Sequence, residues 1–545
     1  MPGTEAGARV PLDRARPAAV GRGTGLARRA EPWLPLAGCA VVAVVLAIAE
    51  NPVADLSAAF AREQASEAGA GLTYWFGWYG GVSPGSYSVL VPLLTPLLGA
   101  VGLLVAASLA VCAAAVPLSR GVAHPAGLRW AVASAAAANL CSGRVAFALG
   151  AALALAGVLS ARRGWYPLAV VLLVASGLAS PLTPAFTGLV AVPLLVTGSR
   201  RSPAVWSLLA GAAAGLAVPF LLFGSAGAQP FPLQTLLWSA ACAAAAYAAL
   251  HATPQRWLLP LAAPVTIGLY LVATGVGSNL GRFFFLVLPC LVLTWSRWRG
   301  LWLVLALLPA LCWQVRDAVQ DQTTAIRDGY GAAEYAPLRE QLLSRADLAG
   351  HRVELLDSPS HAGAYRLGPD VVLARGWENQ SDARYESELF EAASPDAGDF
   401  RRWLADNAVS YVAVADVPLR NFRTRPELGL VAKGLPYLTQ VWSDAHWTLY
   451  RVADPTSIVP APLTLVESAP GRLVVRVPDT DRHEIRIRDS RYLVARSDGD
   501  PERVACLTAT DDDWVTLQAA EPGTYVLAGE FSLAALGGGN ASHCR

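Results

Sequence analysis

Long apolar runs recur over residues 33–315, and the loops between them are short except for residues 50–88. A helix needs about 20 apolar residues to cross a bilayer. Several runs are shorter, so 126–142 and 184–198 are expected to be short, tilted or re-entrant. The pattern predicts a polytopic α-helical membrane domain of about eleven spans, a count good to within two. The expected spans are approximately 33–49, 87–116, 126–142, 144–160, 165–180, 184–198, 204–224, 233–251, 256–275, 281–296 and 299–315.

The pattern changes after Gln314, where charges become frequent and apolar runs shorten to strand length. Residues 316–455 predict an α/β subdomain and residues 456–545 a β-rich subdomain. Residues 1–32 are polar and basic and are expected to form a disordered tail. Helices are expected at 337–346 and 399–407, and strands at 353–356, 411–415, 448–452, 463–466, 472–477, 483–488, 514–518 and 524–528.

Arginines are distributed unevenly over the loops. If the N-terminus is cytoplasmic, every cytoplasmic loop is basic, as the positive-inside rule requires. The short loops on the other side hold only Arg144 and Arg282, and the long first loop, residues 50–88, holds Arg62. We therefore expect a multi-pass plasma-membrane protein whose first loop and C-terminal region are both extracytoplasmic.

Composition agrees with a membrane protein that carries a water-exposed region. Charged residues make up 15% of the chain, against about 25% in a typical soluble protein. The net charge of +1 argues against a nucleic-acid binder. The eight cysteines show no CxxC or Cys/His ligand spacing, so no structural zinc site is predicted. Cys506 and Cys544, the only two in the C-terminal region, could form a disulfide if that region is exported.

Carboxylates are missing from most of the membrane domain. No Asp or Glu occurs between Glu67 and Asp317, which disfavours an ion-coupled pump, since such proteins use ionisable groups inside the bilayer. Acid–base chemistry would therefore need a carboxylate from the first loop or from the C-terminal region. Asp55, just after the first span, is the first candidate for a general base. Glu63 and Glu67, one helical turn apart, follow it, with a solvated helix face as the alternative.

Two arginines and a run of aromatic residues are further candidates. Arg144 and Arg282 each follow a glycine and precede an apolar run, and they could hold a lipid-linked phosphate. The alternative is headgroup contact by snorkelling side chains. The run from Tyr74 to Tyr79 predicts an interfacial aromatic belt or a platform for a sugar ring or polyprenyl chain. Its candidate contact residues are Tyr74, Trp75, Trp78 and Tyr79.

Four segments resemble a known class of proteins: YWFGWYGGVSPGSYSVLVPLLTPLLG at 74–99, SGRVAFALG at 142–150, ARGW at 374–377 and LPYLTQVWSDAHWTLY at 435–450. With the topology, they resemble the GT-C membrane glycosyltransferases and, more narrowly, the bacterial membrane proteins grouped as pyruvoyl-tetrahydropterin-synthase-related. The resemblance implies an acidic residue in the first extracytoplasmic loop, a polyprenyl-phosphate sugar donor and an exported C-terminal domain. Many GT-C enzymes carry adjacent acids or a DxD there, whereas this chain has separate acids.

The sequence thus predicts an inverting GT-C-like glycosyltransferase that moves a sugar from a polyprenyl-phosphate donor to an envelope glycan or glycolipid on the extracytoplasmic face. Asp55, Glu63 and Glu67 are the candidate catalytic residues. No cofactor is assigned, and whether the protein binds a divalent metal stays open. A transporter or lipid flippase and a non-catalytic envelope assembly protein stay open as alternatives.

Overall fold

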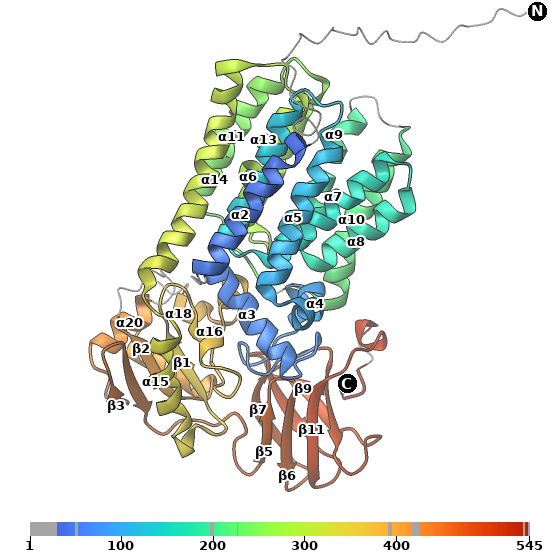
Figure 1. Cartoon of the computed structure of the whole chain (residues 1–545). Helices are drawn as coiled ribbons and strands as arrows, with labels where there is room; N and C mark the ends of the chain where they lie inside the picture. Colours follow the sequence, from blue (N-terminus) through green and yellow to red (C-terminus); the bar gives the residue numbers. More distant parts are fainter. Residues whose placement is uncertain are drawn as a thin grey trace, which may run out of the picture.

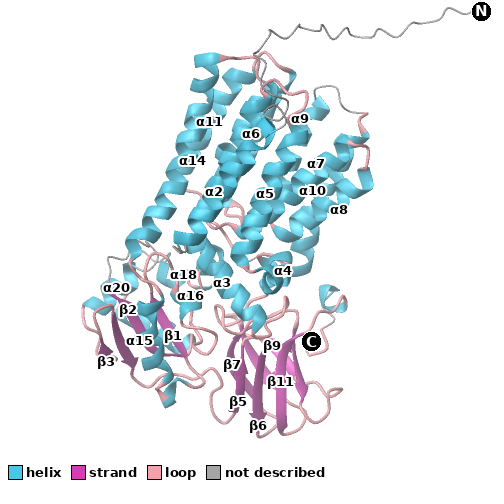
Figure 2. Cartoon of the chain, in the orientation of Figure 1, coloured by secondary structure: helices cyan, strands magenta, loops and turns pink. Residues whose placement is uncertain are grey.

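The computed structural model describes residues 30–49, 53–196, 201–225, 227–390, 395–416, 425–537 and 540–542. A bundle of helices forms one end of the molecule, and two lobes that contain all the described β-sheets hang from its other end (Figures 1 and 2). The predicted polytopic helical fold with an α/β and a β-rich C-terminal region is confirmed.

The bundle helices lie where the apolar runs predict them. Seven described helices are long and apolar enough to cross a membrane, counting η4 to α13 as one. The others are shorter, as expected for 126–142 and 184–198. The bundle elements are α2 (Leu34–Ala49), α5 (Ala100–Leu118), α6 (Pro125–Cys141), α7 (Val145–Arg162), α8 (Tyr166–Ala179), α9 (Leu182–Val196), α10 (Pro203–Phe223), α11 (Leu233–Leu250), α12 (Leu258–Leu271), η4 (Gly277–Leu280), η5 (Phe283–Val287), α13 (Leu288–Trp295) and α14 (Gly300–Asp328).

Two predicted spans have different limits. The run 87–116 is divided at Gly99, whose φ of +70° suits glycine and ends a helix, so a short α4 (Leu90–Leu98) precedes α5. The last span does not end at 315. Helix α14 runs on to Asp328 and ends at Gly329, which adopts the left-handed conformation of a helix C-cap. Its last turns therefore carry polar residues out of the apolar part of the bundle.

The first C-terminal lobe is a mixed four-stranded sheet with short helices. Its strand order is β1-β2-β4-β3, with β1 and β2 parallel. The three strands predicted here are confirmed, and β3 is an addition. The elements are α15 (Ala332–Leu343), β1 (Arg352–Leu356), α16 (Gly363–Arg366), α17 (Asn379–Tyr385), α18 (Ser387–Phe390), α19 (Ala397–Asp406), β2 (Val409–Ala415), α20 (Arg425–Ala432), β3 (Leu438–Ser443) and β4 (Trp447–Val452).

The second lobe consists of two antiparallel sheets, β5-β6-β11-β8 and β7-β10-β9. All five strands predicted here are confirmed, and β8 and β9 were not predicted. The strands are β5 (Thr464–Ala469), β6 (Arg472–Val477), β7 (Arg482–Arg488), β8 (Leu493–Ser497), β9 (Cys506–Ala509), β10 (Trp514–Gln518) and β11 (Gly523–Gly529), followed by the turn η7 (Ala534–Gly537).

The first loop joins the bundle to both lobes. Its helix α3 (Ala54–Glu67) lies at the lobe end of the bundle (Figure 1). Beyond α3, the backbone N–H of Phe76 donates to Pro470 O in the β-rich lobe, and Trp75 and Trp78 pack in the core of the α/β lobe. The loop is therefore the joint that fixes the lobes against the membrane domain.

Candidate functional site

A cavity of about 400 Å³ lies where the bundle meets the α/β lobe. Its walls come from α3, the start of α7, the start of α9, the end of α10, the segment before η5, and residues 377, 378 and 380 of the lobe. Two acids and three arginines line it: Asp55, Glu378, Arg62, Arg144 and Arg282. The cavity thus brings together the first-choice catalytic residue and both predicted phosphate ligands.

Asp55 lies in the first turn of α3, where the helix dipole favours a negative charge. Its Oδ2 lies 3.1 Å from Arg144 Nε and 3.9 Å from Arg282 Nη2. Its Oδ1 makes no hydrogen bond or ion pair with any described residue, and the side chain is 39% exposed. One carboxylate oxygen is therefore held by arginines while the other is accessible from the cavity.

Arg144 is placed by the turn between α6 and α7. Gly143 has a φ of +69°, and a Cβ there would come within 2.7 Å of Val53 and Leu56 side-chain atoms. Only glycine lets this turn lie so close to the start of α3. The close approach brings the Arg144 guanidinium up to Asp55.

Two further carboxylates hold Arg144 from α14. Its Nη1 lies 2.8 Å from Asp317 Oδ2 and its Nη2 3.5 Å from Asp321 Oδ2. Sequence reasoning missed this pair, although its signal was present: two acids four residues apart share one face of a helix that continues from the last apolar run. With three carboxylates around it, Arg144 has little capacity left for a ligand.

Arg282 is less compensated than Arg144. Among the described residues, its only carboxylate partner is Asp55 at 3.9 Å. Its Cζ lies 5.6 Å from the Phe147 ring centroid, a cation–π contact, and the side chain is 18% exposed. It follows Gly281, where a Cβ would meet the Trp313 ring at 2.9 Å. Of the two predicted phosphate ligands, Arg282 is the one with donors to spare.

The α/β lobe covers the cavity through Glu378, which sequence reasoning also missed. Arg62 Nη2 donates to Glu378 Oε2 at 3.2 Å, and Ser381 Oγ donates to the same oxygen. The Arg62 Cζ lies 3.9 Å from the Tyr87 ring centroid. The one signal in the sequence is the ARGW segment, which Glu378 directly follows. The lobe and α3 are thus tied together across the cavity.

The opposite wall is apolar and belongs to α10. Leu216, Pro219 and Phe220 line it. Leu216 is 39% exposed and Phe220 61% exposed, and both belong to a helix that is long and apolar enough to cross a membrane. In a membrane this surface faces lipid. The cavity therefore combines a charged end near α3 with an apolar wall beside the bilayer.

Glu63 and Glu67 line another cavity, of about 510 Å³, on the other side of α3. Glu63 Oε2 accepts from the Ala100 N–H at 3.0 Å and so caps α5. Burial raises the pKa of Glu63 despite that hydrogen bond, and the neighbouring Glu67 charge adds to the rise. The structure does not bring these two acids together with Asp55.

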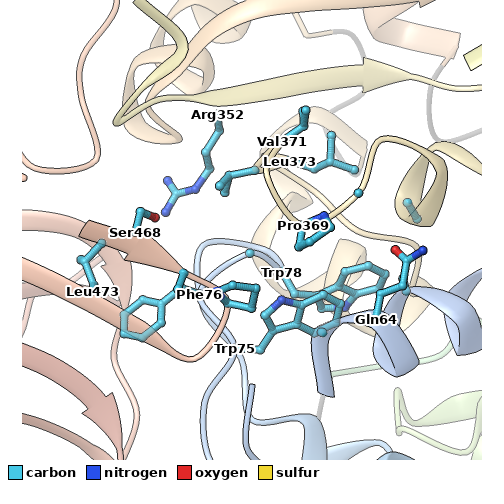
Figure 3. Close-up of a pocket in the computed structure, with 18 of the residues that line it drawn as sticks. Gln64, Trp75, Phe76, Trp78, Arg352, Pro369, Val371, Leu373, Ser468 and Leu473 are labelled. Atoms are coloured by element: carbon cyan, nitrogen blue, oxygen red, sulfur yellow. The ribbon is translucent and has the colours of Figure 1, made fainter. Parts of the chain in front are cut away.

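The aromatic run is buried at the junction with the lobes. Trp75 and Trp78 stack with centroids 4.5 Å apart and, with Phe76, border a small cavity of about 50 Å³ (Figure 3). The Tyr74 hydroxyl donates to Arg488 O, and the Tyr79 hydroxyl donates to Asp382 Oδ1 at 2.6 Å. None of the four candidate contact residues lines the Asp55 cavity.

The remaining predictions concern a metal and a disulfide. No group of three His, Cys, Asp or Glu side chains within the described ranges could hold a metal ion, so the structure supplies no ligand set for the divalent metal that the sequence left open. Cys506, at the start of β9, is disulfide-bonded. Cys544 lies outside the described residues, and its pairing with Cys506 stays a prediction.

No family model matches the chain, and no curated protein matches it. The pyruvoyl-tetrahydropterin-synthase-related family is therefore not confirmed. Among solved structures, the chain is similar to that titled "Single-Particle Cryo-EM Structure of Arabinofuranosyltransferase AftD from Mycobacteria", with 17% identity and a TM-score of 0.45. The match covers 80% of this chain and 41% of the other. This chain thus spans about two fifths of that protein's length.

Proposed function

We propose that the protein is a GT-C-like, inverting glycosyltransferase that moves a sugar from a polyprenyl-phosphate donor to an envelope glycan or glycolipid. The observation that carries the proposal is the convergence of Asp55, Arg144 and Arg282 on one cavity with an apolar wall beside the bilayer. Sugar transfer from a lipid-linked phosphate donor needs three groups in one place: an apolar wall for the lipid, a cation for the phosphate and a base for the acceptor hydroxyl.

The reaction assigns a role to each of these side chains. The accessible Oδ1 of Asp55 takes the proton of an acceptor hydroxyl as that oxygen attacks the anomeric carbon. The bond from the anomeric carbon to the phosphate oxygen breaks, and polyprenyl phosphate leaves with the electron pair. Arg282 donates to the phosphate and stabilises its charge. Arg144 is a positioning residue, because its ion pairs hold Oδ2 of Asp55 and leave Oδ1 free.

The proposed orientation places the cavity outside the cytoplasm. Arg129 pairs with Glu31, close to the start of α2, and donates to Ser119, while Arg162 donates to Arg120 O. These basic segments lie at one end of the bundle, and α3 and the two lobes lie at the other (Figure 1). The cavity is lined by residues of α3 and of the α/β lobe. By the positive-inside rule, the N-terminus is cytoplasmic in the plasma membrane, and the cavity and both lobes are extracytoplasmic.

The proposal is tested with protein reconstituted in lipid nanodiscs. Radiolabelled polyprenyl-phosphate hexoses and pentoses serve as donors, and an envelope glycan extract serves as acceptor. Asp55→Asn should lower sugar transfer by about 10²- to 10⁴-fold, the usual contribution of a general base. The matched control is Asp370→Asn, because Asp370 is 63% exposed on the lobe surface and its one ion pair among the described residues is with Arg339.

Two outcomes would overturn the assignment. If Glu63→Gln abolishes transfer while Asp55→Asn does not, the base lies on the other side of α3. If no donor in the panel reacts while deletion of the gene changes the envelope glycolipids, a non-catalytic assembly role or lipid movement replaces sugar transfer.

A further inference from the structure

An exposed apolar segment follows the last strand of the β-rich lobe. Phe531, Leu533 and Leu536 are 54%, 72% and 36% exposed. Among the described residues from 330 onward, only two other large apolar side chains are as exposed, Leu343 and Val466. Three of five such side chains thus lie within six residues, a concentration that marks an interaction surface.

The position of this segment identifies what covers it. Phe531 stacks on Tyr492 with centroids 5.6 Å apart, and Tyr492 contacts Phe223 at 5.7 Å. The Tyr492 hydroxyl donates to Leu222 O, and Arg491 Nη1 donates to Leu221 O at 3.4 Å. These contacts fix the segment one aromatic ring away from the last residues of α10. Figure 1 shows the turn η7, in red, beside that end of the bundle.

Helix α10 is a candidate membrane span that ends at Phe223. Phe220 and Leu221 near its end are 61% and 62% exposed and face lipid in a bilayer. The exposed side chains of the segment continue this surface at the level where the span ends, which is the headgroup region. Tyr492 has an apolar ring and a polar hydroxyl, as is typical of side chains at that depth.

We infer that residues 531–537 bind the bilayer that surrounds the bundle and insert their apolar side chains at the boundary between its headgroups and its acyl chains. The β-rich lobe is then attached to the membrane at two places, through the first loop and through this segment. The attachment lies next to α10, which forms the apolar wall of the Asp55 cavity. The inference does not depend on the proposed sugar transfer.

The test uses full-length protein in nanodiscs of phosphatidylcholine and phosphatidylglycerol that contain a phosphatidylcholine with a diazirine on its acyl chain. After irradiation and digestion with a nonspecific protease, lipid adducts are quantified by mass spectrometry. We expect adducts on peptides covering 531–537 at several times the yield on the β5 peptide 464–469. The β5 peptide is the internal control, because Val466 is 53% exposed on the same lobe.

Two variants sharpen the test. The double variant Leu533→Asp and Leu536→Asp should lose most of the adducts on 531–537, whereas Val466→Asp should not change them. Both substitute exposed side chains, and thermal melting checks that the lobe is folded. Equal labelling of the two peptides, or no labelling of 531–537, overturns the inference. Loss of a dimer in the double variant, measured by native mass spectrometry, would assign the segment to a second copy and also overturn it.

Discussion

The two sides of α3 border cavities of similar size but opposite character. On one side, Asp55 and Arg62 face a cavity with two further arginines, Arg144 and Arg282. On the other, Glu63 and Glu67 border a cavity where Arg366 is the one basic side chain among the described lining residues. One short helix thus carries Asp55, whose carboxylate is held by Arg144 and Arg282, and two other carboxylates that lie near neither of these arginines. The partners of an acid, more than its place in the loop, therefore decide what chemistry it supports.

The largest effect on stability is expected from Arg144→Gln. Arg144 is 12% exposed and faces Asp55, Asp317 and Asp321. Removing the cation leaves three carboxylates to repel one another. Losing one partner of a fully buried pair costs about 3–5 kcal/mol, and the cost is lower here because the three carboxylates are 27–39% exposed and solvent screens them. We expect the Arg144→Gln protein to melt at a clearly lower temperature in nanodiscs, with Arg144→Lys in between. A melting temperature equal to that of the native protein would show that the three carboxylates do not repel one another when Arg144 is removed.

The two cavities should differ in their binding of a lipid phosphate, which we expect in the Asp55 cavity alone. Charge-assisted hydrogen bonds contribute about 1.5–3 kcal/mol, so Arg282→Gln should weaken binding of farnesyl phosphate by about ten- to a hundredfold. Arg366→Gln, in the cavity on the other side of α3, is the matched control. The measurement is a binding titration in nanodiscs, with farnesol to report the phosphate-independent part. If both variants lose the same amount of farnesyl phosphate affinity, Arg282 does not form a specific phosphate site.

Much of this arrangement could be predicted from the sequence. The apolar runs predict the bundle, and the acid-free stretch from Glu67 to Asp317 restricts the carboxylates to the first loop and the C-terminal region. Arg144 and Arg282 stand out as exceptions to the distribution of basic loops. These signals are local or depend only on composition, so a single sequence is enough to find them.

The remaining parts depend on contacts between residues far apart in the chain. Arg62 meets Glu378 across 316 positions, and Arg144 meets Asp317 across 173. The spacing of apolar residues within one helix does not indicate which other helix that helix contacts. The aromatic run illustrates the same limit: its composition is typical of a membrane interface, but Trp75 and Trp78 pack against the α/β lobe, a partner that the local pattern does not identify.

A smaller effect is expected at Glu63. Its carboxylate caps α5 at Ala100 N, and loss of a helix cap costs about 1 kcal/mol. Glu63→Ala should therefore lower the free energy of unfolding by that amount, whereas Glu63→Gln keeps an acceptor and should lower it less. Because burial raises the folded-state pKa, the folded protein binds the proton more tightly, and stability falls as pH rises from the unfolded pKa through the folded one. Glu63→Gln should remove that fall. A fall of unchanged size would assign the titration to another group.

The smallest effect is expected from Glu67→Gln. Glu67 is exposed, and its charge raises the pKa of Glu63 one turn away. Like charges at this spacing destabilise a helix by about 0.2–0.5 kcal/mol, so Glu67→Gln should stabilise the protein slightly and move the pH-dependent fall in stability to lower pH. The double variant Glu63→Gln, Glu67→Gln should show no shift beyond that of Glu63→Gln alone, because the interacting partner is gone. Stability profiles measured against pH for the two single variants and the double variant give the coupling. A zero coupling would mean that solvent screens the two acids from each other.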